Sequence, residues 1–266
     1  MKSYIALPAS FLLIVGLLFL SSFSSAQSLD ELLKQGDNYL DQEFDLAKAM
    51  ETYQRADKLF PGNWEVMWRL SRTYVYTAEQ MPEKTGKEKD EQLAVYQKAY
   101  NLADSAVKLA PDRSINYLRR GIANGKIALF KGVFSVASVV NAVRDDCQKA
   151  IDLGNGGSYT QGLAHYVLAR THAKVSEKWA PARAILGLGW ADIDKAIDEY
   201  NIAIKLYPNF RMFYVDLAKA YIREDEYEKA KDMLKKAIAS PKREFNDDSA
   251  LTEAKELQNQ IKDEQD

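Results

Sequence analysis

Small and large apolar residues alternate at helical spacing along the last third of the chain. Two sets follow one another at an interval of 34 residues, namely Ala196, Tyr200 and Ala203, then Ala230, Leu234 and Ala237. Spacings of four and three residues place the members of each set on one face of a helix. Small residues let two helix backbones approach closely, and larger ones fill the space between neighbouring helices. The pattern therefore predicts helical hairpins stacked at a fixed interval.

The residues between the two sets fit the same scheme. Pro208 prevents the helix before it from continuing, and Asn209 supplies turn chemistry before the next helix. We expect large side chains to fill the space between hairpins, namely Tyr200, Leu206, Tyr214 and Tyr221. Together with Leu217, Ala218 and the 34-residue interval, these positions resemble tetratricopeptide repeats (TPRs). The resemblance implies an all-α, right-handed α-solenoid with a general role in binding.

Earlier segments repeat the pattern and predict about five hairpins. The first spans residues 29–61, the second 63–111, the third ends near Asn155, the fourth starts near Ala164, and the fifth ends at Pro241. Polar or irregular inserts at 81–91 and 175–189 are predicted to lengthen turns. Residues 247–263 form an amphipathic pattern typical of a helix that caps a repeat array.

The first 26 residues have the pattern of a secretory signal peptide. Lys2 precedes an apolar stretch over 4–20, and small residues lead to Ala26, after which we expect cleavage. The alternative is an uncleaved membrane anchor over 4–20, since about 17 apolar residues lie at the lower limit for spanning a bilayer. The predicted organisation is a signal peptide at 1–26, a helical repeat domain at 27–246, and a capping helix and tail at 247–266. We expect an exported protein, located in the periplasm.

Composition narrows the class of protein. The chain is 28% charged and 47% hydrophobic, with few glycines and prolines, which is typical of a largely helical globular protein. Without Lys2 it has 35 basic and 38 acidic side chains, a net charge of −3. This balance argues against nucleic acid as a partner. The single cysteine, Cys147, has no partner for an internal disulfide and is expected to be a small buried residue.

Residues 127–140, IALFKGVFSVASVV, form an unusually apolar segment. One interpretation is that helix ends and a turn pack under neighbouring hairpins. The other is that the segment forms the wall of a hydrophobic pocket or a patch that touches a membrane.

The inner surface of the predicted solenoid has a distinct composition. In repeat register, the first helix of each of repeats two to five contributes inward residues: Trp68, Arg72, Tyr76, Leu118, Ile122, Lys126, Tyr166, Arg170, Lys174, Lys219 and Arg223. These predict a basic groove containing aromatic side chains that binds a partner with an anionic segment. The alternative is that they are ordinary solvated cations, some of them paired with Asp216, Glu224 or Asp225 along the helix.

No catalytic motif accompanies these patterns. His165 and His172 share a helix face, but no nearby motif offers further metal ligands, so we expect both to pack in the repeat. The sequence also lacks a nucleophile elbow, a phosphate loop and a zinc-protease helix. We therefore expect no enzyme activity, no metal and no cofactor.

Three stretches resemble a narrower family. They are NWEVMWRLSRTYVY at 63–76, AHYVLARTHAKVSEKWAPARAILGLGW at 164–190, and PKREFNDDSALTEAKEL at 241–257. Together they resemble the regulator of microtubule dynamics family. The resemblance implies a TPR-like protein from a family with eukaryotic and bacterial members, some membrane-attached, one branch of which is associated with organelle contact and phospholipid binding. The leader resembles a bacterial one.

Two functions follow as hypotheses. The first is a non-enzymatic scaffold or adaptor of the cell envelope that holds a protein or peptide partner in the groove. The second is a carrier of phospholipid or another amphiphile that uses the groove and the segment 127–140.

Overall fold

The computed structural model describes residues 27–130 and 133–266. The predicted signal peptide at 1–26 lies outside the described residues. Within them the chain forms twelve helices and no strand. Their bounds are α1 (Leu29–Asp41), α2 (Leu46–Leu59), α3 (Trp64–Glu79), α4 (Gly86–Leu109), α5 (Ser114–Ala128), α6 (Val133–Leu153), α7 (Gly157–Ser176), α8 (Ala180–Ile185), α9 (Ile193–Leu206), α10 (Arg211–Arg223), α11 (Tyr227–Ala239) and α12 (Asp247–Gln260).

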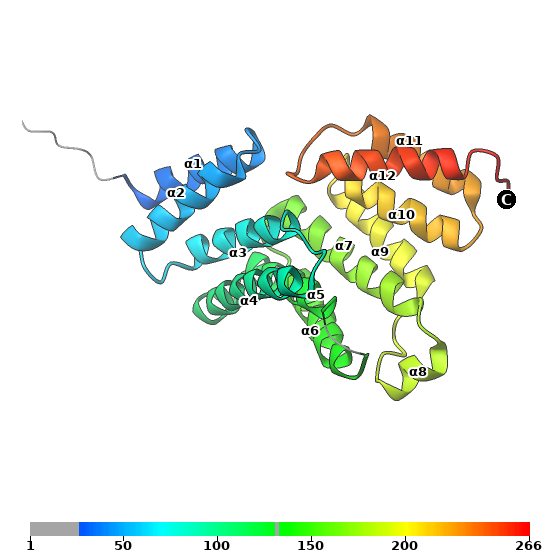
Figure 1. Ribbon diagram of the computed structural model, residues 1–266, viewed down its shortest axis with the longest axis horizontal. Helices are drawn as coiled ribbons and strands as arrows, with labels where there is room; N and C mark the ends of the chain where they lie inside the picture. Colours follow the sequence, from blue (N-terminus) through cyan, green and yellow to red (C-terminus); the bar gives the residue numbers. More distant parts are fainter. Residues whose placement is uncertain (1–26, 131–132) are drawn as a thin grey trace, which may run out of the picture.

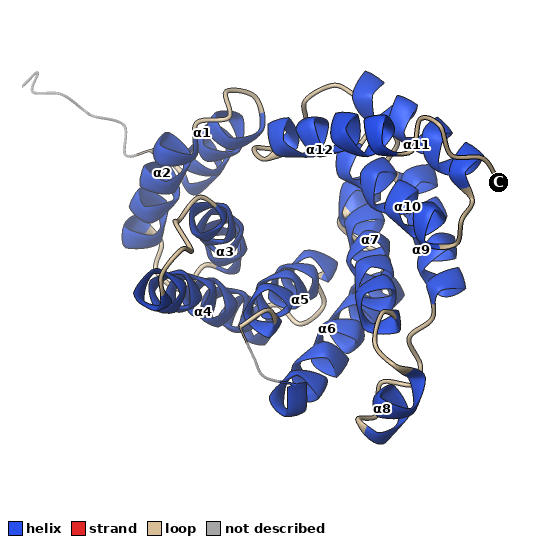
Figure 2. Ribbon diagram, turned by 45° about the vertical axis from the view of Figure 1, so that its right-hand side comes forward, coloured by secondary structure: helices blue, strands red, loops and turns tan. Residues whose placement is uncertain are grey.

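The helices pack in chain order as five hairpins, as the 34-residue pattern predicts, with the short α8 inserted between the two helices of the fourth. The pairs are α1 with α2, α3 with α4, α5 with α6, α7 with α9, and α10 with α11. The first helices of successive hairpins also meet, since α3 contacts α5, α5 contacts α7, and α7 contacts α10. The result is an α-solenoid that curves into an arc, with α1 and α12 facing each other across its opening (Figures 1 and 2). Helix α12 lies on α10 and α11 and covers the end of the array.

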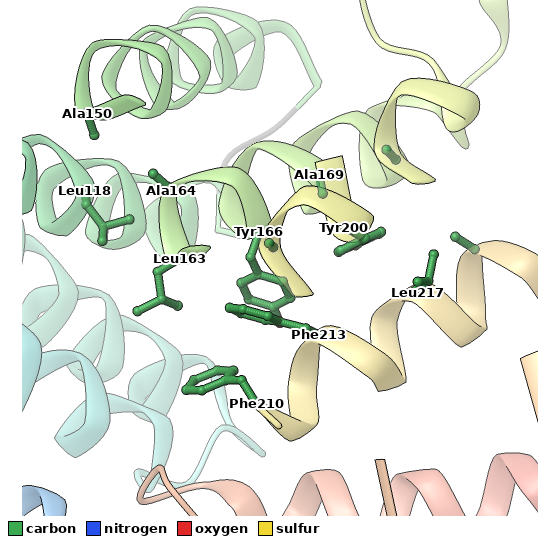
Figure 3. Close-up of a cluster of buried hydrophobic side chains, with 13 residues drawn as sticks. Leu118, Ala150, Leu163, Ala164, Tyr166, Ala169, Tyr200, Phe210, Phe213 and Leu217 are labelled. Atoms are coloured by element: carbon green, nitrogen blue, oxygen red, sulfur yellow. The ribbon is translucent and has the colours of Figure 1, made fainter. Parts of the chain in front are cut away.

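The small residues of the pattern occupy the tightest helix contacts. Ala196, Ala203 and Ala218 have no exposed surface, and Tyr200 is buried beside them. Figure 3 shows the largest core cluster, in which Tyr166 lies over Phe213, with a ring-centroid distance of 4.7 Å. This cluster joins α5, α6, α7, α9 and α10.

Two of the expected packing residues behave differently from the rest. Tyr214 is buried, but Leu206 keeps 36% of its surface exposed at the end of α9 and Tyr221 is only partly buried. The turn chemistry expected of Asn209 is confirmed, because this residue adopts a left-handed φ of 61° between α9 and α10.

The inserts are more helical than the sequence analysis predicts. Residues 81–91 were expected to form a turn, but α4 already begins at Gly86. Thr85 and Glu88 form a reciprocal capping box that starts this helix early. In the insert at 175–189, the short helix α8 begins with Pro181 in its first turn, where the missing N–H has no structural cost. In the described part of the chain, no helix is long and apolar enough to cross a bilayer.

Candidate functional site

The predicted inner residues lie on α3, α5, α7 and α10, but they do not form one open surface. Four are buried: Arg72, Tyr76, Leu118 and Tyr166. Trp68, Ile122, Lys126 and Lys219 are partly exposed, while Arg170, Lys174 and Arg223 are exposed. The predicted continuous groove is therefore wrong for these four residues, because they are not open to a partner.

Each buried member has an internal partner that the sequence analysis did not predict. Leu118 has no exposed surface and packs in the main core, so it lines no groove. Tyr166 donates a hydrogen bond to Asp216 on α10 at 2.8 Å. Arg72 and Tyr76 both bind the carboxylate of Glu244, which lies between α11 and α12.

Apart from Trp68, the exposed and partly exposed members gather around a pocket of about 440 Å³. It lies among α5, α6, α7, α9 and α10. Its apolar lining is formed mainly by Ile122, Ala128, Leu129, Val136, Val140, Val143, Val167, Ala173 and Val175. Residues 131 and 132 of the segment 127–140 lie outside the described residues, and the others have different environments. Ile127 and Ala137 are packed inside, whereas Leu129, 71% exposed, lines the pocket.

Cationic side chains surround this pocket. Its lining includes five of them, Lys126, Arg170, Lys174, Lys219 and Arg223, against two carboxylates, Glu177 and Asp216. All five belong to the predicted set. The structure therefore brings five of the six predicted cations together around this pocket, whereas Trp68, Tyr76 and Tyr166 do not line it.

Asp216 holds the inner part of the cationic lining in place. Its carboxylate lies 3.1 Å from Arg170 Nε and 3.0 Å from Lys219 Nζ. Burial alone would raise the pKa of Asp216, but these two cations and the Tyr166 hydroxyl outweigh it and lower the pKa. The pairing with Asp216 expected for solvated cations is thus present. It orients the two cations toward the pocket.

The other cations are also tethered. Lys126 pairs with Glu79 at 2.5 Å, Lys219 also pairs with Glu253 at 2.5 Å, and Lys174 pairs with Glu177 at 2.8 Å. Arg223 donates to the carbonyl oxygens of Ala173 and Ser176 near the end of α7. Carbonyls at a helix end lack intrahelical donors, so Arg223 satisfies them and joins α10 to α7.

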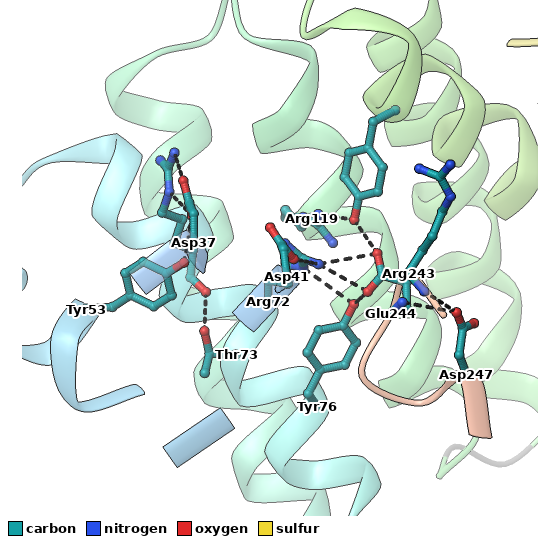
Figure 4. A network of polar contacts seen from close by, with 12 residues as sticks. Asp37, Asp41, Tyr53, Arg72, Thr73, Tyr76, Arg119, Arg243, Glu244 and Asp247 are labelled. Atoms are coloured by element: carbon teal, nitrogen blue, oxygen red, sulfur yellow. Dashed lines mark hydrogen bonds and ion pairs between the residues drawn. The ribbon is translucent and has the colours of Figure 1, made fainter. Parts of the chain in front are cut away.

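A second polar cluster joins α1, α3 and α7 to the segment between α11 and α12 (Figure 4). Glu244 accepts hydrogen bonds from Arg72 Nη2 at 3.1 Å, from Tyr159 at 2.8 Å, and from Tyr76. Arg72 also binds Asp41 on α1 at 2.6 Å. The sequence carries no signal for this cluster, because Glu244 belongs to no repeat and lies 172 residues from Arg72.

The two histidines have separate environments. His165 Nδ1 lies 2.5 Å from a carboxylate oxygen of Glu199, whereas His172 is buried against the edge of Trp190. Burial lowers the pKa of His172, and its Nδ1 accepts a hydrogen bond from the Asp192 backbone. Both side chains pack between helices, as expected. Among the described residues, no group of three or more His, Cys, Asp or Glu side chains is placed to hold a metal ion.

The sequence matches the family described as regulator of microtubule dynamics protein 1-3 over residues 32–262. The chain belongs to this family. The match extends from α1 to beyond the end of α12, so the arc, the pocket and the Glu244 cluster all lie within this family member's matched region. A comparison with curated protein sequences gives no significant match.

Several solved structures are similar to this family member, and TM-scores above 0.5 show the shared TPR fold for the first two described below. A thermophilic TPR protein of Thermus thermophilus is 16% identical to this family member, with a TM-score of 0.60 over 86% of this chain and 100% of that one. PilF of Pseudomonas aeruginosa is 10% identical, with a TM-score of 0.53 over 88% and 91% of the two chains. A crystal structure of MamA is 23% identical, with a TM-score of 0.42 over 77% and 93%. At these identities the likeness concerns the fold.

Proposed function

We propose that the protein is a non-enzymatic TPR scaffold that holds a segment of a partner protein at the pocket between α5, α6, α7 and α10. One observation carries this proposal, namely an apolar pocket with five cationic side chains in its lining. The segment bound there carries an apolar side chain as its anchor and acidic residues beside it. Helical grooves commonly bind peptides through apolar anchors flanked by charge.

The apolar lining of the pocket suits an apolar side chain of the partner segment. Val136, Val140 and Val143 on α6 and Val167 on α7 line this part of it. Leu129 stands at the α5–α6 turn with 71% of its surface exposed. Covering such a side chain is worth about 1.5–3 kcal/mol when burial is complete. A partner side chain that covers Leu129 gains this energy.

The five cationic side chains of the lining favour a partner segment that carries acidic residues. Each exposed ion pair between the pocket and a partner would contribute only about 0–1 kcal/mol to binding, because water screens it. Several cations converging on one carboxylate act together and set which partner is accepted. Lys174, with its side chain 69% exposed, is the cation best placed to exchange its intramolecular partner Glu177 for a partner's carboxylate.

An anionic amphiphile is the second candidate ligand of the same pocket. Its support is the cavity volume of about 440 Å³, which falls within the range of about 300–1,000 Å³ typical of small-molecule sites. The segment 127–140 contributes Ala128, Leu129, Val136 and Val140 to the lining. In this alternative an apolar chain fills the pocket and an anionic headgroup meets the lysines and arginines.

The proposed location is outside the cytoplasm, in the cell envelope. Its support is the sequence of residues 1–26, with Lys2, the apolar stretch and the small residues before Ala26. We propose cleavage after Ala26, and mass spectrometry of the N-terminus of the purified protein tests it. A retained N-terminal peptide containing residues 4–20 would instead establish the membrane anchor.

The test of the binding site compares two matched double variants. Lys174→Glu with Leu129→Ser alters the pocket at two exposed positions. Lys178→Glu with Leu109→Ser makes the same changes at exposed positions outside its lining. Each variant is expressed in the organism that naturally makes the protein, cross-linked to its bound partners in the cells, and purified. The scaffold hypothesis expects a partner polypeptide with the wild type and the control variant, and its loss with the pocket variant. Equal recovery from all three contradicts it.

Native mass spectrometry of the same preparations separates the two candidates. A bound mass of phospholipid size that disappears with the pocket variant supports the amphiphile. A bound polypeptide that disappears in the same way supports the scaffold. Circular dichroism of both variants checks that helix content is unchanged, so that a loss of ligand reports on the pocket alone.

A further inference from the structure

The segment between α11 and α12, residues 240–246, lies against first helices that are distant in sequence. It is not helical, and its Glu244 side chain is inserted between α3 and α7 with only 4% of its surface exposed. Both carboxylate oxygens are bound, one by Tyr159 and the other by Tyr76, with Arg72 contacting both. Figure 4 shows this carboxylate at the centre of the cluster. Hydrogen bonds from charged and hydroxyl donors to one carboxylate are the usual means of recognising an acidic ligand.

The residues after Glu244 extend the contact. Phe245 packs on Tyr76 with ring centroids 6.1 Å apart, and Asn246 donates to Glu79 on α3 at 3.3 Å. Phe245 thereby joins the core cluster formed by α1, α2 and α3. An acidic and an aromatic side chain at adjacent positions therefore provide the main contacts of this segment with α3.

Arg119 on α5 gives independent evidence that the site is built for an anion. Only 4% of its surface is exposed, and its Nη2 donates to the Tyr159 hydroxyl at 3.2 Å. Its Nε is buried and has no hydrogen-bond partner within the described residues. The guanidinium otherwise faces the rings of Trp68 and Tyr159. A buried arginine donor without an acceptor is costly, and a ligand with a further acceptor oxygen would satisfy it.

Burial and charge agree with this assignment. Burial alone would raise the pKa of Glu244, but Arg72 and the hydroxyls of Tyr76 and Tyr159 outweigh it and lower the pKa. The site therefore holds its acidic side chain in the ionised form. The backbone N–H of Glu244 donates to Asp247 at the start of α12, which fixes the segment from its other side.

We infer that α3, α5 and the start of α7 form a binding site for an acidic residue followed by an aromatic residue, and that Glu244 and Phe245 occupy it as an internal ligand. The external ligand is a segment of a partner protein with the same pair of side chains. This segment binds by displacing residues 240–246. Leu129 and Lys174, which carry the proposed function of the other pocket, do not line this site, so the inference does not depend on that function.

The internal ligand weakens external binding by a predictable factor. A site that is open for only a fraction of the time shows an affinity reduced by that fraction. Minor states of this kind are commonly populated at about 0.1–10%. Removing the internal side chains should therefore strengthen binding of an external peptide by about tenfold to a thousandfold.

The probe is a fluorescein-labelled synthetic peptide with the sequence of residues 240–249, SPKREFNDDS. It is titrated by fluorescence anisotropy against residues 27–266, as the wild type and as the double variant Glu244→Ala, Phe245→Ala. The variant is expected to bind at least tenfold more tightly than the wild type. A control peptide with Gln in place of Glu244 and Ala in place of Phe245 should bind the variant at least tenfold more weakly.

Two further variants assign the site. In the double-variant background, Arg119→Gln should weaken peptide binding at least tenfold, whereas Lys178→Glu, at an exposed position outside both sites, should leave it unchanged. If the double variant loses its helical circular dichroism signal, the titration is made with Glu244→Gln, which keeps the side-chain shape, and the same order is expected. A folded variant that binds neither peptide, or both equally, would overturn the inference.

Discussion

Arg72 and Glu244 are 172 residues apart in sequence, yet Arg72 Nη2 lies 3.1 Å from Glu244 Oε2, and both side chains are almost fully buried. This ion pair joins the second hairpin to the segment after the fifth. It thereby connects the two ends of the arc, whose repeats otherwise contact mainly their neighbours. A solenoid without such a connection is held together by nearest-neighbour interfaces alone.

The first prediction concerns the stability that this connection supplies. Glu244→Ala should lower the free energy of unfolding by about 3 kcal/mol, because among the described residues it leaves the buried Arg72 with Asp41 alone as a charged partner. The measurement is urea denaturation followed by circular dichroism. Glu256→Ala, at an exposed position on α12, is the control and should change the free energy by less than about 0.5 kcal/mol. Equal losses for the two variants would contradict the prediction.

The second prediction concerns acid. The folded-state pKa values of Glu244 and Asp216 are lowered from their ordinary values of 4.5 and 3.8, because nearby cations and hydroxyls outweigh the effect of burial. A lowered carboxyl pKa stabilises the fold above the ordinary value, and this stability is lost as the pH falls through the lowered value. The free energy of unfolding should therefore decline on acidification below about pH 4.5.

Charge-neutral variants test the assignment of this acid sensitivity. Glu244→Gln and Asp216→Asn should each be less stable than the wild type near neutral pH and show a flatter decline below about pH 4.5. The measurement is the urea midpoint at a series of pH values. Glu256→Gln should follow the wild-type profile. A decline that remains as steep in both buried variants as in the wild type would assign it to other groups.

The hairpins were predictable because their pattern is local. The pattern of Ala196, Tyr200 and Ala203 is repeated at a fixed interval. A close contact between two helices requires small residues, and this requirement is visible in the sequence. The early start of α4 could also have been predicted from the sequence, because Thr85 and Glu88 form a capping-box pattern. It was missed because the charged insert was interpreted as a turn.

The exposure of the inner residues was not predictable from the same pattern. Repeat register gives the direction in which Arg72 and Tyr166 point, but it does not identify the residues that cover them. Arg72 is covered by Glu244, which belongs to no repeat, and Tyr166 is bound by Asp216 from the next hairpin. Such contacts depend on the curvature of the whole arc, which brings its ends together (Figure 2).

The third prediction concerns Cys147 on α6. Its thiol has no exposed surface, and burial, with smaller effects from Asp146 and Glu199, raises its pKa above the ordinary value of 9.0. Thiolate is the reactive form, so Cys147 should react with a disulfide reagent only when the array opens locally. A folded Cys147→Ala, Asn101→Cys variant, with its thiol at an exposed position on α4, supplies the reference rate. Native Cys147 should react far more slowly, and its rate should rise in urea. Equal rates without urea would contradict its burial.

The last prediction compares two glycines on first helices. At Gly162, an added Cβ would lie 2.9 Å from Tyr207 Cβ and 3.3 Å from the Ala203 carbonyl oxygen, so Gly162→Ala should destabilise the fold by about 1–3 kcal/mol. At Gly125, the nearest atom is a Val143 methyl at 3.9 Å, which is an ordinary contact. Gly125→Ala should stabilise α5 by about 0.5–1 kcal/mol, because alanine loses less backbone entropy in a helix. Thermal unfolding measures both, and shifts of the same sign would show that the helix contact at Gly162 is looser than its geometry implies.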